Sequence, residues 1–259
     1  TLCNGRSPDG DLMPKEGREV LFKTSRMDFK DLYDDLHRIT PATGLSQILD
    51  VMEENNTVYA VEETEKGMTL THYLKLRART LTPVEARTLL QPVMEGVALL
   101  HKAGLIHRGI CPDNILLPID GAARLTGYGT LALRTAGSEL KSQLYPGYAA
   151  PEQFGGMGQT DARTDIYCLG ATLYHLVTGR NPCDPPYEIL PIRQVNPALS
   201  SGLERIIQKC TQRNPDDRYQ SCAELMYALE NYEKIDDAYR KKQKRKLGLF
   251  LASAGLTLA

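Results

Sequence analysis

The stretch from Leu105 to Leu117, L-I-H-R-G-I-C-P-D-N-I-L-L, contains the pattern of polar residues that is most informative about the fold. His107, Arg108 and Asn114 lie close together in it, and its apolar end predicts a short strand. Gly109 stands between the basic residues and the amide. Because glycine has no side chain, residue 109 can neither accept a proton nor orient a hydroxyl group.

The overall composition is that of an ordinary globular protein. The chain has 259 residues, of which 42% are hydrophobic, and a net charge of -1. This length suits one large domain or two lobes, and the near-neutral charge gives no electrostatic reason to expect nucleic-acid binding. The 6 cysteines show no CxxC pair and no metal-ligand spacing, so no metal site is expected. Several lie in apolar runs, which favours buried, reduced thiols and a reducing cytoplasm.

The C-terminal end differs from the rest of the chain. Residues 233–246 end in the basic run K-K-Q-K-R-K, and 247–259 are uncharged and mostly apolar. A helix over 247–259 reaches roughly 20 Å, short of the ~30 Å hydrocarbon core of a membrane. Two interpretations remain, a tail packed on its own domain and the first part of a membrane span. We favour the span because basic residues before an apolar run are typical of a cytoplasmic flank, which predicts a single-pass anchor.

The remaining pattern predicts an α+β fold. Residues 1–27 are rich in glycine, proline and charge, and we expect an extended segment with a turn at Pro8-Asp9-Gly10. Helical spacing of apolar residues predicts a helix over 28–39, and strands are expected at 45–54 and 57–63. Helices dominate afterwards, with starts predicted by capping boxes at Thr82 and Ser221 and further helices over 164–178 and 203–210. A few strands followed by a helical body indicate an α+β class.

Three further motifs follow the opening loop. Ala150-Pro151-Glu152 is similar to the A-P-E motif, and Asp165 begins D-I-Y-C-L-G, similar to the D-x-[WY]-x-x-G start of a kinase helix. Arg218 lies at the position of the kinase arginine that pairs with the A-P-E glutamate. With the loop at 105–117, these residues resemble the protein-kinase fold, and most closely the bacterial serine/threonine kinases.

The resemblance implies a division of the chain into lobes. It predicts a partial small lobe at 28–66 and a mostly helical large lobe at 67–232. Residues 1–27 are then an insert between strand 3 and helix C, so the first three strands of the small lobe are absent from this chain. Lys23 lies too close to the helix to be the strand-3 lysine of the family.

Several matched residues are expected to have structural roles. The resemblance implies a buried ion pair between Glu152 and Arg218, and hydrogen bonds from the loop backbone to Asp165. His107 and Tyr128 match two members of the family's hydrophobic spine, so we expect them to pack in the core.

Three acids that the family uses for phosphoryl transfer are replaced. Gly109 stands for the proton acceptor, Gly127 for the metal-binding Asp of D-F-G, and Leu32 for the helix-C glutamate that pairs with a lysine. Asn114 remains, but a neutral amide alone is a weak ligand for Mg²⁺. In the nucleotide pocket, Leu116 matches the residue below the adenine, and Glu62 stands at the gatekeeper position, where an acid suits adenine poorly.

These replacements predict a pseudokinase that needs no ATP or metal cofactor. We expect a signalling or scaffold module at the cytoplasmic face of a bacterial membrane, whose partner is an active kinase or a cell-envelope protein. Arg108 is a candidate phosphate or partner contact, with a purely structural role as the alternative. The competing function is a weak kinase or another nucleotide-dependent transferase that uses Asp113 as its base.

Overall fold

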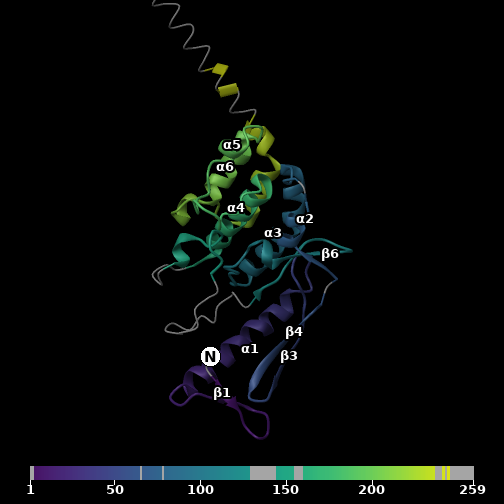
Figure 1. Ribbon diagram of the computed structural model, residues 1–259, viewed down its shortest axis with the longest axis vertical. Helices are drawn as coiled ribbons and strands as arrows, with labels where there is room; N and C mark the ends of the chain where they lie inside the picture. Colours follow the sequence, from purple (N-terminus) through teal and green to yellow (C-terminus); the bar gives the residue numbers. More distant parts are fainter. Residues whose placement is uncertain are drawn as a thin grey trace, which may run out of the picture.

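The computed structural model describes residues 3–64, 66–77, 79–128, 144–154, 160–236, 241–242 and 244–245. A small lobe contains helix α1 and the strands β1 to β4, and a larger lobe is mostly helical (Figure 1). The arrangement agrees with the expected α+β class, and the lobe boundary at residues 66 and 67 stays a prediction. Residues 247–259 lie outside the described part, so the predicted anchor stays a prediction. Within the described part, no helix is long and apolar enough to cross a membrane.

The N-terminal segment is more regular than the sequence indicates. Strands β1 (Cys3–Arg6) and β2 (Leu12–Pro14) form an antiparallel hairpin around the predicted turn. Helix α1 (Glu19–Ile39) then begins nine residues before the predicted start at residue 28, so the expectation of an extended segment through residue 27 is wrong. The helix starts early because Phe22 is buried and extends the apolar face of Tyr33 and Leu36 by three turns.

The predicted strands at 45–54 and 57–63 are confirmed, with shorter bounds. Strands β3 (Ile48–Glu54) and β4 (Thr57–Glu62) pair antiparallel and pack against α1. Their turn consists of Asn55 and Asn56, at φ 52° and 55°, a conformation that asparagine tolerates. The Leu12 N–H donates to Asn55 O at 2.9 Å, so β2 is fastened to this turn.

The side of the β3–β4 hairpin that α1 does not cover is partly apolar. Leu49, Met52, Tyr59 and Val61 are all exposed there.

A third sheet connects the lobes. Its strands are β5 (Gly67–Thr69), β6 (Ile115–Pro118) and β7 (Arg124–Leu125), in the order β5-β6-β7. Leu125 exchanges backbone hydrogen bonds with the chain just before β3, since its N–H donates to Gly44 O and its carbonyl accepts from Ser46 N–H. The strand that precedes Gly127 is therefore fixed to the small lobe.

Helices form the large lobe, in the order α2 (Leu70–Leu76), α3 (Pro83–Lys102), α4 (Ala162–Thr178), α5 (Ile192–Val195), α6 (Ser201–Cys210) and α7 (Cys222–Glu230). The predicted capping box is present at α3, where Thr82 and Glu85 exchange side-chain-to-backbone bonds. Helix α4 ends as predicted at Gly179, which adopts φ 70°.

The core centres on α4, which packs against α3, α5 and α6. Of its residues, Ile166, Leu169 and Leu173 are almost fully buried. The cysteines at 111, 168, 210 and 222 are buried and Cys183 is half-buried, as expected for cysteines in apolar runs.

Candidate functional site

The backbone of the loop at 105–117 is held by one buried carboxylate. Asp165, at the start of α4, has no exposed surface. Its Oδ2 accepts from His107 N at 2.8 Å and its Oδ1 from Arg108 N at 2.7 Å. His101 Nε2 lies 2.8 Å from Oδ2. Arg108 is thereby held at φ 65°, which is uncommon for a residue other than glycine. Asp165 therefore has the scaffolding position that the sequence predicted.

His107 is a fully buried, neutral packing residue. Its Nδ1 accepts from Gly109 N–H at 3.2 Å, so the ring proton lies on Nε2, which donates to Thr126 O at 2.9 Å. Burial lowers the pKa of this imidazole, although the Asp165 carboxylate acts in the opposite sense. Both ring nitrogens are used inside the protein.

Tyr128 lies beside His107, with an edge-on ring contact at 6.1 Å between centroids. It is fully buried in the same core cluster as Leu36 of α1 and Ile48 of β3. Its hydroxyl lies 2.8 Å from Ser46 O and 3.1 Å from Leu125 O. The tyrosine thus packs as predicted and also bonds the backbone that joins the lobes.

Asn114, the one metal-binding residue that the sequence retains, is engaged at both ends of its amide. Nδ2 donates to Gly109 O at 2.7 Å, and the Tyr145 hydroxyl donates to Oδ1 at 3.4 Å. The residue is buried, at 7% exposure. The oxygen that would face a metal ion is therefore directed at a tyrosine hydroxyl.

Gly127 is packed directly against this amide. Its backbone has φ +82°, and a β-carbon there would lie 2.6 Å from Cγ and Oδ1 of Asn114. Any side chain at residue 127, including a carboxylate, requires Asn114 to move.

The rest of the loop interior offers no charged group. Ile110, Cys111 and Pro112 are buried, and burial raises the pKa of the Cys111 thiol to about 12. Asp113, in the 3₁₀ turn Pro112–Asn114, is exposed. It is the one carboxylate of the loop at 105–117.

In the small lobe, the positions of the family's lysine–glutamate pair hold no such pair. Leu32 is half-buried and packs on the main core cluster. Lys23 is an exposed residue of α1, so it is not a strand lysine. Glu62 ends β4, with Oε2 3.5 Å from Thr126 Oγ1. Desolvation by neighbouring atoms raises the pKa of its carboxyl, although the residue remains exposed. Leu116 is half-buried in β6, across from Thr69.

Glu152 and Arg218, the predicted pair, form a bidentate ion pair with distances of 2.7 and 2.8 Å. The Arg218 side chain is fully buried, and it also donates to three backbone carbonyls. Burial would raise the pKa of the Glu152 carboxyl, but the hydrogen bonds and charge of Arg218, a backbone hydrogen bond and the Thr164 hydroxyl together lower that pKa. The pair joins the A-P-E turn to the segment before α7.

Sequence reasoning missed two residues of this site. Tyr145 caps Asn114 from 31 positions away, and Cys111 fills the loop interior. A tyrosine six residues before the A-P-E proline was the only available signal. Arg108 donates its N–H to Asp165 and accepts from Gln153 Nε2 at 2.8 Å. Residues 129–143 lie outside the described part of the chain, and the phosphate or partner contact of Arg108 stays a prediction. Within the described part, no cluster of three or more metal-binding side chains occurs.

Comparisons with known proteins identify relatives of this chain. The chain is 30% identical over 251 residues to the serine/threonine-protein kinase PrkC of Bacillus subtilis (strain 168), covering 88% of this chain and 38% of PrkC. It is 30% identical over 205 residues to the serine/threonine-protein kinase PknL of Mycobacterium tuberculosis (strain ATCC 25618 / H37Rv), covering 72% of this chain and 50% of PknL. The chain thus spans half or less of the length of these two relatives.

The fold is also that of solved kinase structures. The crystal structure of the Mycobacterium tuberculosis PknI kinase domain superimposes with a TM-score of 0.67 at 23% identity, covering 80% of this chain and 79% of that one. Residues 35–229 match the family model of the protein kinase domain. The chain therefore belongs to the protein kinase domain family, and its relatives are bacterial serine/threonine kinases.

Proposed function

We propose that this chain is a pseudokinase, a kinase domain without phosphotransferase activity that serves as a regulatory or scaffold module. One observation carries the proposal. The side-chain amide of Asn114, the remaining metal-binding residue, hydrogen-bonds with Gly109 O and the Tyr145 hydroxyl. The same amide fills the space beside Gly127, where the family has a carboxylate.

The physical reason concerns charge. Phosphoryl transfer depends on metal ions that bridge the phosphates and on positioned charges, and protein carboxylates hold those ions. Residues 109 and 127 have no side chain, and between residue 109 and Asn114 the loop is apolar and buried apart from Asp113. The residues present do not fit Mg²⁺–ATP.

A binding role is supported by what remains intact. The Asp165 and Glu152–Arg218 anchors hold the loop and the turn at 151–153 in fixed positions. Phe154 is 51% exposed directly after this turn and offers an apolar contact. We propose a protein partner here, an active kinase or a cell-envelope protein, and a location at the cytoplasmic face of a membrane. A partner kinase could place phosphate near Arg108.

The second candidate is a weak kinase or another nucleotide-dependent transferase. Asp113 favours it, because an exposed carboxylate in the loop is free to approach a substrate hydroxyl. This candidate requires a nucleotide site, and therefore a measurable binding of ATP.

Thermal unfolding with ATP, with and without Mg²⁺, separates the two candidates. A ligand that binds only the folded state raises the unfolding midpoint by mass action. The pseudokinase proposal predicts no Mg²⁺-dependent rise. A Mg²⁺-dependent rise together with label transfer that Asp113→Ala abolishes would establish the second candidate instead.

A further inference from the structure

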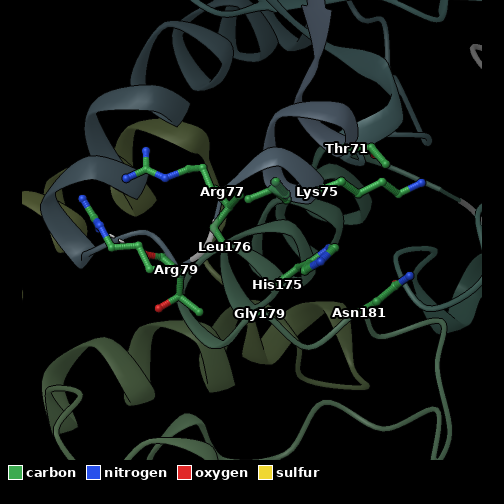
Figure 2. Close-up of a pocket in the computed structure, with 10 residues that line it drawn as sticks. Thr71, Lys75, Arg77, Arg79, His175, Leu176, Gly179 and Asn181 are labelled. Carbon is green, nitrogen blue, oxygen red and sulfur yellow. Dashed lines mark hydrogen bonds between the residues drawn. The ribbon is translucent and has the colours of Figure 1, made fainter.

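A basic cavity of about 410 Å³ lies between α2, the segment after it and the C-terminal end of α4 (Figure 2). Its volume is within the range of ligand-binding pockets. None of the loop residues 105–117 lines it, and its described lining contains no acidic residue. The polar lining residues that matter below are Thr71, Lys75, Arg77, Arg79, His175 and Asn181.

The two arginines are already paired. Arg77 and Arg79 contact Glu85 Oε1 at 3.1 and 2.8 Å. Hydrogen bonds from Arg79 and Thr82 hold the pKa of the Glu85 carboxyl well below its ordinary value. In Figure 2 both arginine side chains extend to one side, whereas Lys75 extends to the other. Two cations therefore share one carboxylate, and Lys75 is not part of this group. In the part of the chain that the structure describes, Lys75 makes no ion pair.

The tautomer of His175 follows from its neighbours. Asn181 Oδ1 accepts from Cys183 N at 2.9 Å and from the Tyr148 hydroxyl at 3.2 Å. Since that hydroxyl donates to Asn181, it accepts from His175 Nδ1–H at 2.6 Å. The neutral ring therefore has a lone pair on Nε2, and no hydrogen bond from the described residues reaches this atom.

This lone pair discriminates between anions. Burial lowers the pKa of His175, which keeps the ring neutral near pH 7. A carboxylate is unprotonated at that pH, so its oxygen would face the lone pair without a hydrogen between them. A phosphate monoester has a second pKa near 6, so one proton can lie between its oxygen and Nε2. The positive Lys75 and the Asn181 amide suit the remaining phosphate oxygens.

We propose that the end of this cavity formed by Lys75, His175 and Asn181 binds a phosphate monoester. The group comes either from a phosphorylated protein segment or from a small phosphorylated metabolite. A second cavity, also of about 410 Å³, shares Gly179 and Asn181 with the first and carries Asp184 and Glu188. A bound phosphorylated peptide is long enough to contact both cavities, whereas a compact metabolite occupies only the first. The two phosphate sources therefore differ in whether they contact the second cavity.

Titration calorimetry on the whole chain tests the site. The probes are a short peptide with O-phosphoserine followed by lysines, the same peptide with unmodified serine or with glutamate, and glucose 6-phosphate. We expect the phosphopeptide or the sugar phosphate to bind, and the serine and glutamate peptides to bind at least several-fold more weakly. Tighter binding of the phosphopeptide than of glucose 6-phosphate identifies a protein segment as the source, and the reverse order identifies a metabolite.

Three variants locate the binding. Lys75→Gln is expected to weaken phosphate binding about three- to tenfold, because it removes one charged hydrogen bond at a partly exposed site. Lys102→Gln is the matched control, since this exposed lysine lies at the opposite end of α3 from Glu85. Glu85→Gln is expected to strengthen binding by freeing the charge of the two arginines. The proposal is overturned if Lys75→Gln binds like Lys102→Gln, or if the serine peptide binds as well as the phosphopeptide. Nucleotide binding is measured separately, so this result is independent of the pseudokinase proposal.

Discussion

The side-chain amide of Asn114 fills the space beside Gly127, where a β-carbon would lie only 2.6 Å from Cγ and Oδ1. Unstrained contacts between such atoms are about 3.5 Å or longer. Asn114 cannot simply turn away, because Gly109 O and the Tyr145 hydroxyl both bond it. A carboxylate at residue 127 therefore conflicts with the present arrangement of the loop.

Gly127→Ala should lower the free energy of unfolding by about 2–4 kcal/mol. The strained left-handed backbone and the contact with Asn114 both contribute to this loss. Urea unfolding measures it. Gly104→Ala is the matched control, since Gly104 has φ +77° with no atom within 4 Å of its β-carbon position. The control should lose only about 1 kcal/mol.

A double-mutant cycle isolates the contact between the two residues. In an Asn114→Ala background, Gly127→Ala should cost less than in the natural chain, because the crowding atoms are gone. Equal costs in both backgrounds would show that Asn114 does not crowd residue 127.

Tyr128→Phe should cost about 1–2 kcal/mol of stability. The ring keeps its packing against His107, but the Ser46 carbonyl loses its bond to the hydroxyl. Tyr227→Phe serves as the control, because Tyr227 is 70% exposed and should change stability little. Similar losses in the two variants would contradict the structural role of the Tyr128 hydroxyl.

Glu152→Ala should lower the free energy of unfolding by about 3–5 kcal/mol, since it leaves the buried Arg218 guanidinium without its counter-charge. Asp216→Ala removes an ion pair with Arg163 in which the aspartate is 76% exposed, and it should change stability by less than about 1 kcal/mol. Chemical unfolding of both variants gives the comparison, and a small loss in Glu152→Ala would argue against a buried pair.

The buried His107 should make stability depend on pH. Its folded pKa lies below 6.5, so the unfolded chain binds more protons in the interval between the two values. The free energy of unfolding should therefore fall as the pH drops below about 6.5. His107→Gln retains a donor for Thr126 O without a titrating group, and its unfolding should show a weaker pH dependence between pH 7.5 and 5.5. An unchanged slope would mean that His107 does not titrate on unfolding.

Local signals predicted the elements that depend on neighbours in the sequence. The capping box of Thr82 and Glu85 and the Asn55-Asn56 turn are short-range patterns, and both are present. The early start of α1 was missed because Gly17 and Pro14 suggest loop, whereas the burial of Phe22 depends on packing with distant residues. Helix α2 was missed because it has only seven residues, too few to show a clear helical spacing of apolar residues.

The resemblance to the kinase motifs indicated that glycines at 109 and 127 stand in place of acids, but it did not predict how these glycines pack. The Tyr145 contact spans 31 positions and exists only in the folded chain. The basic cavity likewise combines α2 with the end of α4, about a hundred residues later. No sequence pattern places Lys75 beside His175.

The most direct test of the pseudokinase proposal is phosphotransfer by the purified chain. It uses ATP with a radiolabelled γ-phosphate, excess Mg²⁺ and a general protein substrate, and it compares the natural chain with Asp113→Ala. The proposal predicts that label incorporation, into the substrate and into the chain itself, equals that of a protein-free control. Incorporation above that control in the natural chain, lost in Asp113→Ala, would contradict the proposal and assign the reaction to this loop.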